Sequence, residues 1–214
     1  DTDIVGRPVK HRAADKQVSG SAVYVDDMPR LEGELYLGLV VSSRAHARIL
    51  SVDTSAALEL EGVVDWVDHT SIAKDRNMFS LAIVRDELVF AEQEVFCVGM
   101  IIGGVVARDQ ETAQRAARMV RVEYQDLPAI VTMEQAIEAE SYHAWPHNKI
   151  ETGDVDSVLQ SWDPELMVEG SMRTGAQEHF YLETHATIAI PSGEDDEMKS
   201  RASTQNPTAT QNVG

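Results

Sequence analysis

The chain has 214 residues, of which 43% are hydrophobic and 25% charged, as in ordinary globular proteins. Its formal net charge of -18 disfavours nucleic-acid phosphates and anionic membrane surfaces as partners. The single cysteine, Cys97, excludes a disulfide within the chain and a cluster held by several thiolates. Because Cys97 lies in an apolar run, we expect a buried, inert thiol.

The N-terminal half is expected to be rich in strands. Residues 1–19 are polar and read as a linker, and a short helix is expected over 56–60, before Gly62. One helical turn at most is expected over 70–74. Apolar or alternating runs predict strands over 22–25, 34–42, 48–53, 63–67, 88–90 and 94–107.

The C-terminal half mixes helices with strands. Asp109 is a typical N-cap for a helix that continues to Val120, and Thr132 caps a second helix over 133–140. Gly103 and Gly104 indicate a bend or bulge in the strand before Asp109. Strands are also expected over 121–124, 167–174 and 180–190, with an acidic turn over 192–196. Since helices and strands do not alternate strictly, the class is α+β.

The composition also predicts domain boundaries. Residues 141–156 contain Pro146 and Gly153 and are the best candidate linker. A first domain then covers 20–140, and 157–214 is the beginning of a second domain. Neither end of the chain has a natural closing element, so we expect a fragment of a longer protein.

Two groups of residues could bind a metal. His179, Glu183 and His185 would share one face of a strand, which could ligate a metal or be a hydrogen-bonded polar face; the residues alone favour the second interpretation. His143 and His147 have the spacing of a helical zinc pair, but the proline between them excludes the helix. No nucleophile elbow, P-loop or dinucleotide fingerprint is present.

Several segments, in the same order, resemble molybdenum hydroxylases of the xanthine dehydrogenase and aldehyde oxidase family. Three are similar to that family's hammerhead domain and two to the start of its molybdopterin-binding region. The resemblance therefore implies an α+β aldehyde oxidase/xanthine dehydrogenase a/b hammerhead domain, followed by a truncated molybdopterin-binding domain. The phrase over 180–185 favours the xanthine dehydrogenase type. The segments are Gly20–Pro29, Ser43–Ile49, Val122–Ile130, Gly175–His185 and Ser203–Asn206.

The resemblance assigns one residue to the cofactor. In this family a glutamine in the motif Gly-x-Gln-x-His-Phe-Tyr-Leu-Glu lies beside the molybdenum oxo group, and Gln177 matches it. A neutral amide donates two hydrogen bonds, whereas a carboxylate would repel an anionic cofactor. Gln177 is thus expected to orient the molybdenum centre without ligating it. The alternative is a strand-end glutamine that binds a backbone group. Ala176 departs from the glycine of many relatives, which bears on the local backbone geometry.

The resemblance also implies a larger enzyme. It would hydroxylate hypoxanthine to xanthine and xanthine to urate, and pass electrons through [2Fe-2S] clusters and FAD, on domains absent here, to NAD. The family's glycine-rich loop, substrate-binding arginine and glutamate base are also absent from this sequence. The fragment alone is therefore expected to be inactive and to bind no molybdenum.

The expected partners are a purine substrate, the remainder of the same polypeptide and a second copy in a homodimer. Neither nucleic acid nor membrane is expected, and the compartment is the cytoplasm, with the peroxisome as the alternative. Two other interpretations stay open: an aldehyde oxidase fragment, and a stand-alone, non-catalytic α+β interaction module.

Overall fold

The structure is a computed structural model that describes residues 5–79, 87–142, 152–161, 165, 167–177, 185–193 and 197–213. The chain divides into two units, one made of residues 130–181 and the other of 1–129 with 182–214. Small antiparallel sheets are mixed with short helices, which confirms the α+β class.

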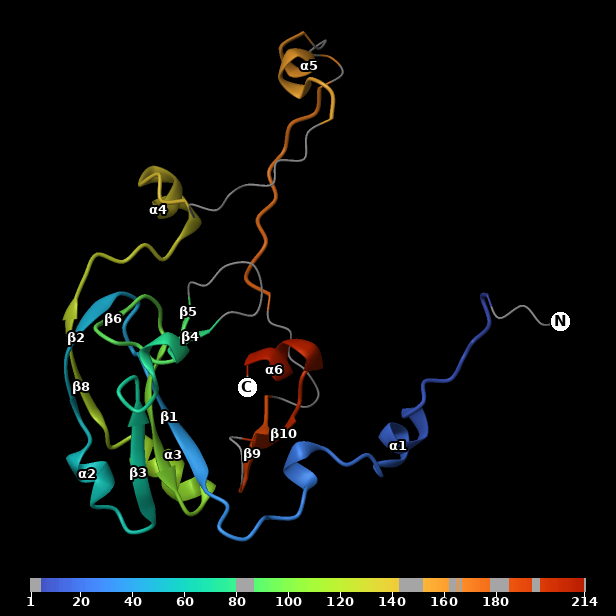
Figure 1. The fold of residues 1–214 in the computed structure, drawn as a ribbon. Coiled ribbons are helices and arrows are strands. Elements are labelled where there is room, and N and C mark those ends of the chain that lie inside the picture. The colour runs from blue at the N-terminus through green and yellow to red at the C-terminus, as the bar shows by residue number, and fades with distance from the viewer. Residues whose placement is uncertain are drawn as a thin grey trace. The chain divides into compact units, whose positions relative to one another are not determined.

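The first sheet has three antiparallel strands in the order β1 (Tyr36–Val41), β7 (Ile101–Ala107) and β3 (Val63–Asp68). Figure 1 labels the two outer strands, β1 and β3. Helix α3 (Gln110–Ala117) follows β7 and packs mainly on β1 and β7. The Asp109 carboxylate begins the helix by accepting a 2.8 Å hydrogen bond from the Thr112 backbone N–H. The sequence predicted this cap, but the helix ends at Ala117 rather than at Val120.

The second sheet has the order β6 (Glu94–Val95), β2 (Ala47–Asp53) and β8 (Arg121–Asp126), again antiparallel. Its apolar side chains meet those of the first sheet, so the core lies between the two sheets. The buried residues of this cluster are Val40, Ala47, Ala91, Val95 and Ile102. A second cluster joins helix α2 (Ser55–Leu58) to β7 and α3 through Ala57, Val105 and Ala116.

Two glycines allow the close packing of these elements. A Cβ on Gly38 would lie 2.2 Å from the Ala113 carbonyl oxygen, so α3 can approach β1 only where a side chain is missing. A Cβ on Gly103 would lie 2.2 Å from the Trp66 ring. The pairing of β1 with β7 shifts by one residue where Val40 and Val41 face Gly103 and Ile101. The irregularity predicted at the glycine pair therefore lies just before it.

The remaining elements are short. The unit that contains the two sheets also includes a hairpin and several helices, whereas the unit of residues 130–181 has only helices among its described elements. The elements are α1 (Ala14–Ser19), η1 (Val25–Asp27), η2 (Lys74–Arg76), β4 (Met78–Phe79), β5 (Glu87–Leu88), α4 (Met133–Glu138), α5 (Val155–Ser161), β9 (Thr187–Ser192), β10 (Glu197–Ala202) and α6 (Pro207–Val213).

The long strand predicted over 94–107 is wrong, and so is the buried Cys97. The chain turns at Gly99, which has a φ of 91°, and leaves β6 and β7 on either side. The turn is fixed to the end of β1, because the Gly99 N–H donates to the Ser42 carbonyl and the Ser42 N–H to that of Met100. Cys97 lies in this turn and is exposed. An apolar run was mistaken for a single buried strand.

Other local predictions also need correction. Val25 begins a 3-10 turn instead of ending a strand over 22–25, and 167–174 has no regular structure. Helix α1 lies within the predicted linker 1–19, and the helical turn expected over 70–74 lies later in the chain, at η2, which begins at Lys74. Helices α5 and α6 were not predicted. The part of the predicted 180–190 strand that is described begins as β9 at Thr187; residues 178–184 lie outside the described residues.

Candidate functional site

Gln177, the predicted cofactor contact, ends a segment without helix or strand that begins at Met167. Every side chain of this segment is exposed, including that of Gln177. Among the residues that the structure describes, the Gln177 amide has no hydrogen-bond partner. Its two N–H donors are therefore not committed to the described chain, as an external acceptor would require.

The segment is attached to α4 within the same unit. The Arg173 guanidinium, four residues before Gln177, forms an ion pair with the Glu134 carboxylate in the first turn of α4. Thr132 and Gln135 form a capping box that begins this helix, with the Thr132 hydroxyl accepting from the Gln135 N–H at 3.2 Å. Since Arg173 and Glu134 are both well exposed, their ion pair contributes little to stability.

The two predicted metal groups fall largely outside the described residues. These include His179, Glu183, His143 and His147. His185 is described and exposed, and it precedes β9. Within the described ranges, no three His, Cys, Asp or Glu side chains lie close enough to hold a metal ion together. The structure thus describes Gln177 as exposed, whereas of the other candidates it describes only His185.

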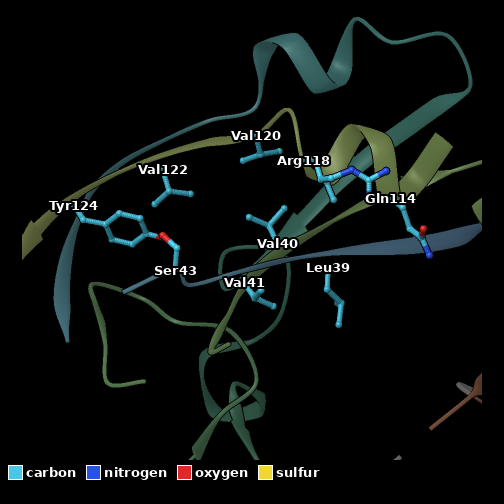
Figure 2. Close-up of a pocket in the computed structure, with 10 residues that line it drawn as sticks. Leu39, Val40, Val41, Ser43, Gln114, Arg118, Val120, Val122 and Tyr124 are labelled. Carbon is cyan, nitrogen blue, oxygen red and sulfur yellow. The ribbon is translucent and has the colours of Figure 1, made fainter. Parts of the chain in front are cut away.

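A groove beside the first sheet was not predicted from the sequence. It has a volume of ≈ 370 Å³ and opens between β1, α3 and β8, as Figure 2 shows. Val40, Val120 and Val122 give it apolar walls, and Arg118 is the charged side chain among its lining residues. It offers no acid–base pair and no set of metal donors, so its geometry supports packing rather than catalysis. β1 is distant in sequence from α3 and β8, so no local pattern could have indicated the groove.

Two protein-family models match successive parts of this chain. Residues 19–128 match the family model described as "Aldehyde oxidase and xanthine dehydrogenase, a/b hammerhead domain". Residues 139–213 match the molybdopterin cofactor-binding domain. This chain belongs to the aldehyde oxidase and xanthine dehydrogenase family. The expected combination of a hammerhead domain and a molybdopterin-binding domain is confirmed, and the second domain supports a molybdenum–molybdopterin cofactor.

The relatives of this chain include xanthine dehydrogenases and xanthine dehydrogenase/oxidases. The chain is 50% identical to the xanthine dehydrogenase/oxidase of Mus musculus over 209 residues, which is 98% of this chain and 15% of that protein. It is 47% identical to the xanthine dehydrogenase of Drosophila pseudoobscura pseudoobscura over 212 residues, or 99% of this chain and 16% of that protein. The chain thus spans about 15% of the length of these relatives.

Solved structures agree with this assignment. An aldehyde oxidoreductase from Desulfovibrio gigas aligns with a TM-score of 0.72 and 26% identity, over 89% of this chain and 23% of that one. Quinoline 2-oxidoreductase from Pseudomonas putida 86, at 23% identity and a TM-score of 0.73 over 92% of this chain and 26% of that one, shows the shared fold. In the described ranges, no helix is long and apolar enough to cross a membrane.

Proposed function

We propose that this chain is part of a xanthine dehydrogenase whose full polypeptide hydroxylates hypoxanthine to xanthine and xanthine to urate. The observation that carries the proposal is the identity of 50% to a xanthine dehydrogenase/oxidase along 98% of the chain. A similarity confined to the fold would fit many oxidoreductases, but this one includes both domains in order.

Gln177 is the residue of this chain that we assign to the cofactor. When bound, the molybdenum–molybdopterin group supplies the oxidation of a substrate carbon and takes up its electrons. The exposed and uncommitted amide of Gln177 fits such a group as a neutral donor of two hydrogen bonds. It would orient the cofactor and leave the metal's charge unchanged, whereas a carboxylate at this position would oppose an anionic group.

The other parts of the reaction belong to the remainder of the polypeptide. We propose that [2Fe-2S] clusters and FAD on other domains carry the electrons to NAD, and that the whole enzyme is a cytoplasmic homodimer. We propose also that this 214-residue chain alone turns over no purine, because the glycine-rich loop, substrate arginine and glutamate base that the resemblance implies are absent from it.

The test compares Gln177→Ala with the parent enzyme in the full-length polypeptide. We expect kcat for xanthine to fall by roughly ten- to a thousandfold, as the loss of one donor to a transition state often does. Molybdenum content, measured by mass spectrometry of the metal, should be retained. Gln160→Ala, which removes an exposed glutamine on α5, serves as the matched control and should keep full activity.

Three results would contradict different parts of the proposal. Unchanged turnover by Gln177→Ala with full molybdenum content would remove the role of this amide but leave the enzyme class intact. Oxidation of aldehydes without turnover of xanthine or hypoxanthine by the parent enzyme would assign the chain to an aldehyde oxidase. Purine turnover by the isolated chain would refute its predicted inactivity.

A further inference from the structure

The imidazole of His46 lies between two oxygen atoms that can only accept hydrogen bonds. Its Nδ1 is 2.6 Å from the Pro128 carbonyl oxygen, and its Nε2 is 2.7 Å from Oε1 of Glu94. The ring also stacks on Phe96, with centroids 5.9 Å apart and an interplanar angle of 28°. The His46 and Glu94 side chains are about 30% exposed, so protons can exchange with solvent.

The number of N–H donors that the His46 ring needs for its two contacts decides its charge. A neutral imidazole has one N–H donor, whereas a backbone carbonyl and an ionised carboxylate supply no proton. Both short contacts can be hydrogen bonds only if His46 is an imidazolium. In agreement, the hydrogen bond to the Pro128 carbonyl, and then that to Glu94, raise the pKa of His46 above its ordinary value of 6.5, against the opposing effect of burial.

These hydrogen bonds lie where the chain leaves the second sheet, directly after β8. β8 ends at Asp126, and the unit that contains Gln177 begins four residues later in the sequence, at Ile130. The Leu127 N–H donates to the His46 carbonyl at 3.0 Å, so His46 holds this exit by backbone and side chain together. Its other bond fastens the ring to β6 through Glu94.

We propose that His46 is a protonation-dependent latch that holds Leu127 and Pro128, where the chain leaves the second sheet, against β6. The imidazolium makes both bonds, and the neutral ring must release either Glu94 or Pro128. Because the pKa is raised in the folded protein, the latch is closed below about pH 6.5 and opens as pH rises through the raised value. The latch does not depend on the proposed activity.

The charged groups around the ring favour this interpretation. Glu94 is the acidic group in contact with it, and Arg48 faces Glu94 directly across the β2–β6 pairing. On the side of β8, Asp126 is 3.4 Å from the guanidinium of Arg44, which lies over the Tyr124 ring. Glu94 is therefore the group whose removal should change the titration of His46 most.

The test uses the full-length polypeptide, in which mass spectrometry of histidine C2–H exchange reports the pKa of single histidines. We expect His46 to titrate above 6.5. Amide exchange of a peptide covering 122–130, corrected for the intrinsic effect of pH, should become about three- to tenfold faster through the same midpoint, as the loss of one partly exposed hydrogen bond predicts.

Two variants separate the latch from a purely structural contact. Glu94→Gln keeps an acceptor without its charge, so the His46 midpoint and the exchange midpoint should both move to lower pH. His46→Gln should abolish the pH dependence of the peptide, whereas His11→Gln, at an exposed site in the N-terminal segment, should leave it unchanged. A His46 midpoint at or below 6.5, or peptide exchange that does not follow it, would overturn the proposal.

Discussion

The substitution Gly38→Ala tests the packing that joins helix α3 to the first sheet. The added methyl group would lie 2.2 Å from the carbonyl oxygen of Ala113 and 2.5 Å from its carbonyl carbon. Both atoms belong to the helix backbone and cannot rotate away. An ordinary contact begins at 3.4 Å, so the helix must retreat by 3.4 − 2.2 = 1.2 Å.

The loss in the free energy of unfolding depends on the contacts of α3 that this retreat weakens. Ala113 and Ala116 are buried at 1% and 0% exposure, and Ala116 packs on Val105 in the second core cluster. A gap of this size forfeits about half or more of the attraction in each contact, and overpacking of this kind costs about 3 kcal/mol. Alanine regains about 0.5–1 kcal/mol over glycine within a strand, so the net loss is about 2 kcal/mol.

Thermal or urea unfolding followed by tryptophan fluorescence measures this change, since Trp66 is partly buried and packs against both core clusters. A loss of about 2 kcal/mol predicts a melting temperature lower by about 4–8 °C. Gly104→Ala is the matched control, because the atoms nearest its new methyl group belong to the side chain of Leu37, which is 52% exposed and can rotate. Equal stability of the Gly38→Ala variant and the parent, or a greater loss for Gly104→Ala, would refute the reasoning.

Two further predictions concern single polar residues. Asn77→Ala should lower the free energy of unfolding, measured by urea titration, by about 3 kcal/mol. Asn77 is 1% exposed, and its amide bonds both the N–H and the carbonyl of Phe90, which would lose their partner. A change below about 1 kcal/mol would contradict this prediction. Asp109→Ala should lower the melting temperature by roughly 2–4 °C through loss of the α3 cap. The Thr112 backbone N–H, and then its hydroxyl, lower the pKa of Asp109, so the difference between parent and variant should be present above about pH 4 and vanish as pH falls through the lowered pKa. A difference that persisted at lower pH would argue against the cap.

Local patterns predicted those elements whose burial follows from their own sequence. The strand at Tyr36–Val41 and the helix that Asp109 caps each carry their signal within a few residues. The turn at residues 96–100 was missed because its position depends on hydrogen bonds to Ser42, which is far away in sequence. Gly99 was the local signal of this turn, because glycine adopts a positive φ readily. The turn that it allows separates β6 from β7 and leaves Cys97 exposed.

Local sequence patterns gave even less information about the candidate site than about the fold. A lone glutamine in a polar segment has no periodicity that distinguishes a cofactor contact from a surface residue, and Gln177 was identified only by its resemblance to a family motif. His46 shows the same limit, because Pro128 and Glu94 reach its ring from segments 82 and 48 residues away. Only the folded chain shows that two acceptors face one imidazole.

We propose that the Gln177 amide faces the molybdenum cofactor in the full-length enzyme. An experimental structure of the full-length, cofactor-loaded polypeptide tests this claim most directly, through the distance from Nε2 of Gln177 to the nearest oxygen of the cofactor. We predict a hydrogen-bond distance of about 3 Å. A side chain that points away from the cofactor, beyond about 6 Å and with no bridging water, would contradict the assignment.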